Sequence, residues 1–230
     1  MVNVLISRTS IISTPWAIRE LEKYFRKDMK VVVLAFSFFG NLTEEEYFNE
    51  YGIDSIQDIK VRNTFELFGI KDVKWIYYYK QSNKEAINLI NNADILYLPG
   101  GAPDLMMERI NEKGLLSSLK NFKNIVVGSS AGAMIQLERY HISKDNEYNK
   151  FAIHEGLEYI NDFFIEVHFR NRKKQKSSMR RMRKEFKKPV YIIPDDGMII
   201  VDDKKIKTIN SAKKYYDRKG IIKVIKWKKV

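Results

Sequence analysis

Short apolar runs rich in β-branched residues alternate along the chain with longer segments in which apolar residues recur at helical spacing. The short runs are typical of buried strands, and the longer segments are typical of amphipathic helices. The predicted strands are residues 2–7, 30–36, 73–78, 95–98 and 124–128. The predicted helices are residues 15–25, 55–67, 84–92, 103–110 and 131–137. This alternation predicts an α/β fold, a three-layer α/β/α sandwich around a mostly parallel central sheet.

The start of the first helix and the last third of the chain carry further signals. Ser13 and Thr14 can cap a helix, and Pro15 suits the first helical position. Beyond the first helices the pattern predicts strands at 163–168, 190–193 and 198–201, a helix at 177–186, a turn at 202–203 leading into 204–209, and a hairpin around Gly220. No linker or internal repeat interrupts the pattern, so residues 1–230 are predicted to form a single α/β domain.

The composition excludes several kinds of site. The chain has no cysteine, so it can have neither a disulfide, nor a thiolate metal site, nor a cysteine nucleophile. Its three histidines, His141, His154 and His168, are not spaced as a metal-binding pair, and we predict neither a metal nor a cofactor. No apolar run approaches the roughly 20 residues that cross a bilayer, and the start lacks the pattern of a signal peptide. We therefore expect a cytoplasmic protein without a membrane partner.

The net charge of +12 makes nucleic acid a partner to consider, because lysine and arginine release counterions from phosphates. The excess is concentrated in residues 170–188, where eleven basic residues stand against the single acid Glu185. A non-catalytic protein that binds nucleic acid or another polyanion through this segment is one hypothesis. We rank it second, since the aromatic residues in the segment are scattered and the other lysines are dispersed as on a solvated surface.

The strongest local signal is the sequence GSSAG at residues 128–132, directly after an apolar run and directly before a helical segment. A G-x-S-x-G motif at a turn from strand to helix lifts the serine off the sheet, where its hydroxyl is exposed to a substrate. Ser130 is therefore the predicted nucleophile, and Ser129 lacks the flanking glycines. The alternative is a glycine-rich turn that only packs tightly or holds a phosphate.

A second glycine turn follows a neighbouring predicted strand. Gly100 and Gly101 come directly after the run at 95–98, and the carboxyl ends of parallel strands meet at one edge of a sheet. A backbone N–H of this turn and that of Ala131 are predicted to converge on one point and form an oxyanion hole. The alternative is an ordinary turn.

A serine nucleophile needs a base, and only histidines are suitable in this chain. His168 ends an apolar run at 163–167, whereas His141 and His154 lie in polar sequence and are predicted to be surface residues. His168 is therefore the predicted base, with a structural histidine at a strand end as the alternative.

The third member of a triad is a carboxylate that orients the imidazole. Asp195 and Asp196 follow the predicted strand at 190–193 and precede Gly197. Either aspartate suits this role, and either can also be an ordinary turn residue. The sequence leaves the choice between them open.

Together and in this order, these segments resemble the family of dipeptidase E (aspartyl dipeptidase) and cyanophycinase, serine peptidases whose fold is similar to class I glutamine amidotransferases and flavodoxin. The resemblance covers roughly the whole chain, and it is carried by residues 3–6, 99–101, 128–132, 167–169 and 193–197. It implies a triad of Ser130, His168 and Asp195, with Asp196 as the alternative acid. It also implies an oxyanion hole formed by Gly101 and Ala131.

The resemblance further implies how a substrate is held. Members recognise a carboxylate near the scissile bond, which implies substrate contacts for Gly100, Arg170 and Arg172. Cyanophycinase-type sequences have Asp-Gln before the histidine, whereas this chain has Glu166 and Val167, so cyanophycin is not assigned. We predict hydrolysis of small peptides, including dipeptides with an acidic residue. A non-peptide esterase or amidase is an alternative, and a homodimer is compatible with the sequence.

Overall fold

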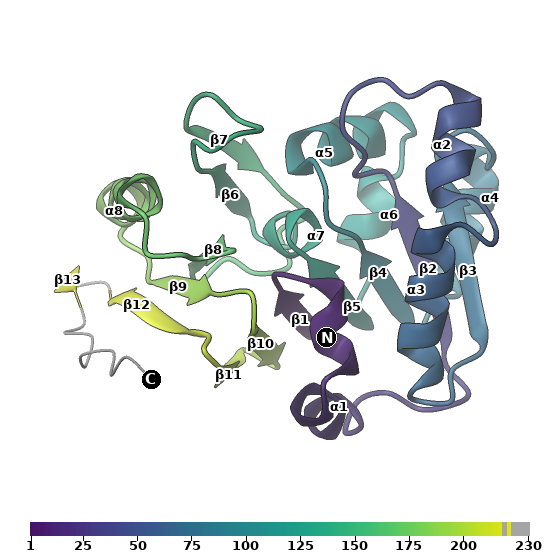
Figure 1. The fold of residues 1–230 in the computed structure, drawn as a ribbon, viewed down its shortest axis with the longest axis horizontal. Coiled ribbons are helices and arrows are strands. Elements are labelled where there is room, and N and C mark those ends of the chain that lie inside the picture. Colours follow the sequence, from purple (N-terminus) through teal and green to yellow (C-terminus); the bar gives the residue numbers. More distant parts are fainter. Residues whose placement is uncertain (218–219, 222–230) are drawn as a thin grey trace.

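The computed structural model of the protein describes residues 1–217 and 220–221, and a seven-stranded sheet lies at its centre (Figure 1). The strand order is β11-β10-β1-β5-β4-β2-β3. Five neighbouring strands are parallel: β1 (Val2–Ile6), β5 (Ile125–Ser129), β4 (Ile95–Leu98), β2 (Lys30–Ala35) and β3 (Asp72–Tyr77). At one edge, β10 (Gly197–Asp202) and β11 (Lys205–Asn210) are antiparallel. The predicted mostly parallel sheet is confirmed.

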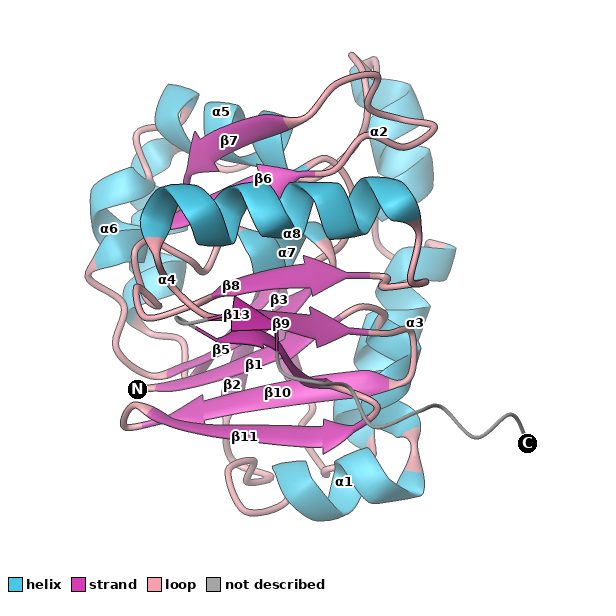
Figure 2. Ribbon diagram, turned by 90° about the vertical axis from the view of Figure 1, so that its left-hand side faces the viewer, coloured by secondary structure: helices cyan, strands magenta, loops and turns pink. Residues whose placement is uncertain are grey.

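Helices cover both faces of this sheet (Figures 1 and 2). One face packs against the 3-10 helix η1 (Thr9–Ser13), α1 (Pro15–Leu21), α2 (Glu44–Tyr51) and α3 (Ile56–Glu66). The other packs against α4 (Asn83–Asn91), α5 (Pro103–Glu112), α6 (Leu116–Lys120) and α7 (Ala131–Met134). In β2, Val31 and Val33 enter the first core and Val32 and Leu34 the second. Because successive side chains of a strand point to opposite faces, this two-sided burial confirms the α/β/α sandwich.

Local signals account for most helix starts. The hydroxyl of Thr14 accepts the backbone N–H of Ala17, and Pro15 is the first residue of α1, as predicted. The sequence prediction does not include α2, which begins at a capping box between Thr43 and Glu46. Only two side chains of this acidic helix are buried, so its apolar periodicity is weak.

A second, four-stranded sheet lies beside the first and has the order β13-β12-β9-β8. Its strands are β8 (Phe164–Val167), β9 (Val190–Ile193), β12 (Lys213–Asp217) and β13 (Gly220–Ile221). β8 and β9 are parallel, and the predicted hairpin is formed by β12 and β13, with its turn residues 218–219 outside the described part. α8 (Lys173–Phe186) begins four residues before the predicted start and packs against β6, β8 and β9 (Figure 2).

That hairpin corrects the predicted placement of two histidines. β6 (Arg139–Ile142) and β7 (Ala152–Glu155) pair antiparallel, and neither strand is predicted from the sequence. His141 lies on β6 with a side chain that is 1% exposed, and its Nε2 is 2.7 Å from Glu166 Oε2. His154 is half-buried and stacks on Tyr140. The prediction that both are surface residues is wrong for His141, because the polar sequence around it forms a strand that packs against β8.

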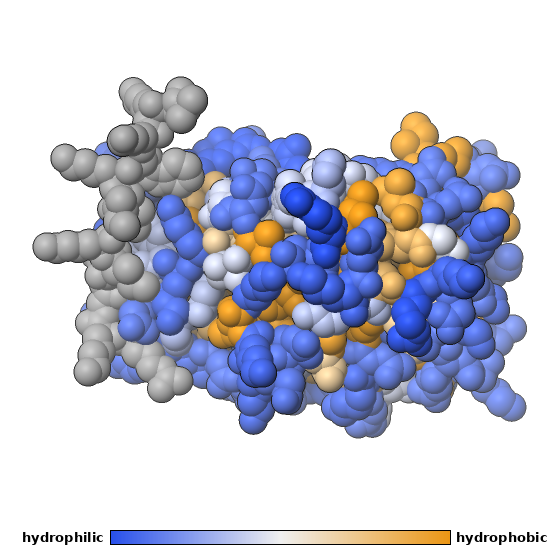
Figure 3. Space-filling view, turned by 90° about the horizontal axis from the view of Figure 1, so that it is seen from below, coloured by the Kyte–Doolittle hydropathy of each residue, from blue (hydrophilic) through white to orange (hydrophobic). Residues whose placement is uncertain are grey.

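No helix in the described part of the chain is long and apolar enough to span a membrane. Seen from below, hydrophilic side chains cover most of the surface, and apolar side chains gather between them in the middle of this face (Figure 3).

Candidate active site

The chain makes a tight turn at Ser130, between β5 and α7. Ser130 has φ 48° and ψ −107°, a conformation that a residue other than glycine rarely adopts. Its N–H donates to the carbonyl of Ile6 on β1. A side chain at Gly132 would place its Cβ 1.9 Å from the carbonyl oxygen of Leu98, so the helix can approach β4 only with glycine there. The structure therefore contains the strand-to-helix elbow that the GSSAG sequence predicts.

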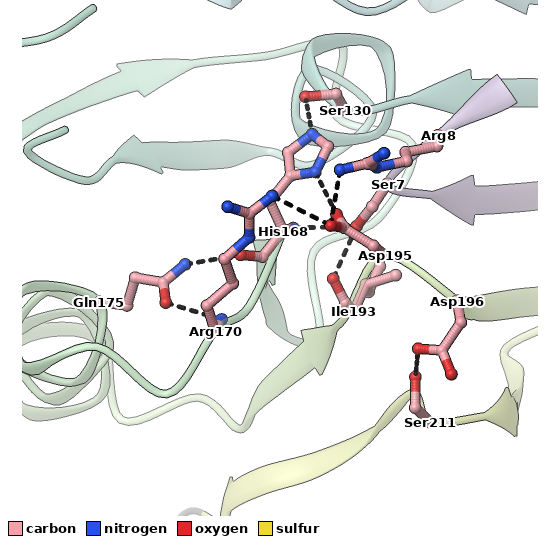
Figure 4. A network of polar contacts seen from close by, with 10 residues as sticks. All are labelled: Ser7, Arg8, Ser130, His168, Arg170, Gln175, Ile193, Asp195, Asp196 and Ser211. Atoms are coloured by element: carbon pink, nitrogen blue, oxygen red, sulfur yellow. Dashed lines mark hydrogen bonds and ion pairs between the residues drawn. The ribbon is translucent and has the colours of Figure 1, made fainter. Parts of the chain in front are cut away.

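The structure brings Ser130, His168 and Asp195 into one chain of hydrogen bonds (Figure 4). The distance from Ser130 Oγ to His168 Nε2 is 3.0 Å, and that from His168 Nδ1 to Asp195 Oδ1 is 2.6 Å. The three residues follow the carboxyl ends of β5, β8 and β9. This geometry is that of a nucleophile, a base and an acid that orients the base.

The two adjacent aspartates have different partners. Asp195 contacts the imidazole, whereas Asp196 accepts a hydrogen bond from the hydroxyl of Ser211, and its backbone carbonyl accepts one from Asn210 (Figure 4). Of the two candidates that the sequence leaves open, only Asp195 therefore reaches His168.

Two arginines hold the second oxygen of Asp195. Arg8 Nη2 lies 2.7 Å and Arg170 Nη2 lies 3.2 Å from Asp195 Oδ2 (Figure 4). Partial burial raises the pKa of Asp195, but the hydrogen bonds from His168, Arg8 and Arg170 outweigh it and lower the pKa from 3.8 to about 2. Arg170, which the sequence analysis assigns to substrate binding, contacts the carboxylate beside the histidine. Arg8 is missing from the sequence prediction, because no local motif marks it.

The lowered pKa of Asp195 predicts a pH-dependent contribution to stability. Because the unfolded chain binds this proton more tightly than the folded one, the carboxylate stabilises the fold above pH 3.8, and the contribution is lost as the pH falls toward about 2. Denaturant unfolding of the wild type and Asp195→Asn between about pH 2 and pH 6 measures it. The wild type should have a larger free energy of unfolding than Asp195→Asn near pH 6, and this difference should shrink as the pH approaches about 2. A difference that does not vary with pH would contradict this expectation.

The backbone of His168 is held from two sides. His168 has φ 48°, and its N–H donates to the hydroxyl of Ser7 at 2.9 Å. Ser7 is buried at the end of β1 and donates in turn to the carbonyl of Ile193 at 2.6 Å. The side-chain amide of Gln175 on α8 donates to the carbonyl of His168. These contacts fix the imidazole between the two sheets, and they join segments too distant in sequence for pattern analysis to find them.

The predicted glycine turn lies against the serine. A Cβ at Gly100 would be 3.3 Å from the Cβ of Ser130. Gly101 has φ +144°, and the carbonyl of Ser37 is too close for a side chain there. Ala131 is the first residue of α7, so its N–H has no acceptor within the helix. The glycine turn and the start of α7, the two backbone segments of the predicted oxyanion hole, therefore both border Ser130.

Two cavities flank Ser130, and Gly101, Ser130 and His168 line both of them. The large cavity has a volume of about 690 Å³ and extends toward β6, β8 and the start of α8. Arg170 and Arg172, two of the predicted substrate contacts, line it. The small cavity has a volume of about 410 Å³ and extends toward η1, α3 and β3. Gly100 lines this second cavity.

The basic segment 170–188 makes several contacts within the protein. Arg170 contacts Asp195, Lys188 Nζ lies 2.7 Å from Glu138, and the guanidinium of Arg181 lies 4.4 Å from the ring centre of Phe151. These three members of the basic segment therefore hold α8 and the residues around it in place.

Comparison with known proteins agrees with this geometry. A model of peptidase family S51 matches residues 58–209, a range that includes Ser130, His168 and Asp195. The structure resembles that of a candidate peptidase E protein from Listeria monocytogenes EGD-e, with a TM-score of 0.64 and 16% identity over 90% of this chain and 97% of that one. It also resembles a peptidase from an acI-B1 Actinobacterium, with a TM-score of 0.59 and 14% identity over 91% and 87% of the two chains.

At these identities the two structures support the fold, and the family match carries the assignment. No curated protein matches the sequence. The fold is the α/β fold of peptidase E and of the glutamine amidotransferases, as the sequence predicts. Since the family model matches most of the chain, the protein belongs to peptidase family S51, the dipeptidase E family of serine peptidases.

Proposed function

We propose that the protein hydrolyses small peptides through an acyl-enzyme formed on Ser130. The observation that carries the proposal is the continuous chain of hydrogen bonds from Ser130 Oγ through His168 to Asp195. Ser130 Oγ attacks the peptide carbonyl while His168 Nε2 takes its proton. The same nitrogen then returns the proton to the leaving amine as the C–N bond breaks.

The second half of the reaction uses the same groups. Water attacks the acyl-enzyme, His168 Nε2 accepts a proton from it, and Ser130 is released with that proton as the acyl product leaves. Asp195 keeps the imidazole in the tautomer that accepts at Nε2. The backbone N–H groups of Gly101 and Ala131 stabilise the negative oxygen of each tetrahedral intermediate.

The large cavity supports a preference for an acidic residue in the substrate. Arg172 lines this cavity, and no carboxylate in the described part of the chain pairs with its guanidinium. A guanidinium binds a carboxylate with two parallel hydrogen bonds. Because Arg170 already contacts Asp195, Arg172 is the better candidate for the substrate's acidic side chain.

The test is a panel of dipeptides that differ in one group, such as Asp-Leu, Asn-Leu and Leu-Leu, measured with the wild type and Arg172→Met. The wild type should hydrolyse Asp-Leu best, and Arg172→Met should lower kcat/KM for Asp-Leu by about tenfold, as expected for loss of a charged hydrogen bond. Hydrolysis of Leu-Leu should change little. Turnover of simple acyl esters without turnover of any dipeptide would contradict the peptide substrate, and an unchanged Asp preference in the variant would contradict the role of Arg172.

A further inference from the structure

The small cavity lies on the opposite side of Ser130 from the large one and has no role in the reaction described so far. Gly101, Ser130 and His168 form the boundary that the two cavities share. A peptide whose carbonyl carbon lies at Ser130 Oγ therefore extends into both cavities, with the acyl part in one and the leaving part in the other.

The charges that line the two cavities differ. The large cavity contains the carboxylates of Asp145, Glu147 and the buried Glu166 among its basic residues. Among the described residues that line the small cavity, the only charged side chains are Arg8 and Lys60, and both are cationic. The small cavity is thus suited to an anion, while the large one contains groups of both signs.

The two cations of the small cavity are not equivalent. Arg8 forms an ion pair with Asp195. Lys60 lies on the exposed side of α3, and its ammonium pairs with no carboxylate anywhere in residues 1–217. Lys60 is therefore the cation that is free to bind a ligand.

The rest of the lining supplies hydrogen-bond donors. Thr9, Ser10 and Tyr51 contribute hydroxyl groups. The indole N–H of Trp75, a buried residue in the wall of the cavity, has no hydrogen-bond partner among the described residues. Because that nitrogen is itself buried, the hydroxyl groups are the donors that can reach the oxygen atoms of a carboxylate in this cavity.

We propose that the small cavity binds the free α-carboxylate of the amino acid that leaves, with Lys60 as its principal charged contact. The inference rests on the proposed function, since it needs the scissile bond at Ser130. In a dipeptide the C-terminal carboxylate is separated from the scissile nitrogen by a single α-carbon, so it stays within one residue of the reacting bond. In a longer peptide a neutral amide takes that position. The protein is then a dipeptidase because of this subsite, with Lys60 as a specificity-determining residue.

The experiment compares Asp-Leu with its C-terminal amide, Asp-Leu-NH₂, on the wild type, Lys60→Met and Lys60→Arg. Lys71→Met is the matched control, because Lys71 follows the same helix and lines neither cavity. We expect Lys60→Met to lower kcat/KM for Asp-Leu by about tenfold, in the range of one charged hydrogen bond, and to change kcat/KM for the amide by less than about twofold. Lys60→Arg should retain most of the preference for the free acid. Equal losses on both substrates, or no loss on Asp-Leu, would overturn the proposal.

Binding to Ser130→Ala separates this inference from the catalytic one. This variant should bind Asp-Leu about tenfold more tightly than the amide, and adding Lys60→Met should abolish the difference. If the wild type hydrolyses no dipeptide while the binding difference is present, the proposed function fails and the carboxylate subsite is supported. If hydrolysis occurs without any binding difference, the subsite is wrong and the proposed function stands.

Discussion

Replacing Ser130 by alanine is expected to lower kcat for dipeptide hydrolysis by roughly 10⁴- to 10⁶-fold, the loss seen when a catalytic serine is removed from other serine peptidases. The reason is that Ser130 Oγ lies 3.0 Å from His168 Nε2 and forms the acyl bond in the proposed mechanism. Without it, the base has no nucleophile to activate, and only water bound by chance can react. The residual rate reflects substrate positioning and the backbone N–H groups. Steady-state hydrolysis of Asp-Leu, followed by release of leucine, measures the effect.

Ser129→Ala is the matched control. Ser129 is the neighbouring residue, buried at the end of β5, and the hydroxyl of Ser130 is the one that contacts His168. The control should retain kcat within about tenfold of the wild type, and circular dichroism should show both variants folded. Comparable losses in both variants, or a Ser130→Ala protein with more than about 1% of wild-type activity, would exclude Ser130 as the nucleophile.

Asp195→Asn is expected to lower kcat by about 10⁴-fold, as in other Ser-His-Asp triads. The two arginines explain why the amide would be harmful here. Arg8 and Arg170 both donate toward Asp195 Oδ2, so an asparagine places its carbonyl oxygen there and its NH₂ group toward His168 Nδ1. That NH₂ group can only donate, so Nδ1 must accept and the proton of the imidazole moves to Nε2. His168 can then no longer take the proton of Ser130.

The adjacent aspartate offers a control of the same chemistry. Asp196→Asn removes a charge one residue away, from a side chain that contacts Ser211 and not the imidazole. Its kcat should stay within about tenfold of the wild type, because no group of the triad is touched. A pH profile of kcat/KM for all three proteins distinguishes a lost base from a lost fold. If Asp196→Asn has the larger effect, the assignment of Asp195 is wrong.

Features that depend on neighbouring residues could be predicted from the sequence. The central parallel strands β2, β4 and β5 have buried side chains on both faces and therefore appear in the sequence as nearly continuous apolar runs. The elbow at residues 128–132 could also be predicted, because its signal is local. Gly132, the glycine that lets α7 approach β4, lies within the motif. His168 and the pair Asp195–Asp196 were predicted because each follows an apolar strand, and strand ends are where α/β enzymes place their chemistry.

Where the chain has polar sequence, the prediction was less complete. The β6-β7 hairpin is short, and α2 buries only two side chains, so neither produces a strong apolar period. For this reason His141 was predicted at the surface, although it is buried against Glu166. Its partner lies 25 positions away, and no periodic pattern reports such a contact.

The sequence by itself determined the class of fold, the serine elbow and the short set of residues from which a triad can be drawn. Only the tertiary structure decided which aspartate faces His168, and that Arg8 and Arg170 share the other carboxylate oxygen of that aspartate. It also decided that Ser7 joins the ends of β1, β8 and β9. The physical reason is the range of the interactions. Backbone propensity and burial leave a periodic pattern along the chain, whereas a hydrogen bond between Ser7 and Ile193 spans 186 positions and exists only once the two sheets are packed together.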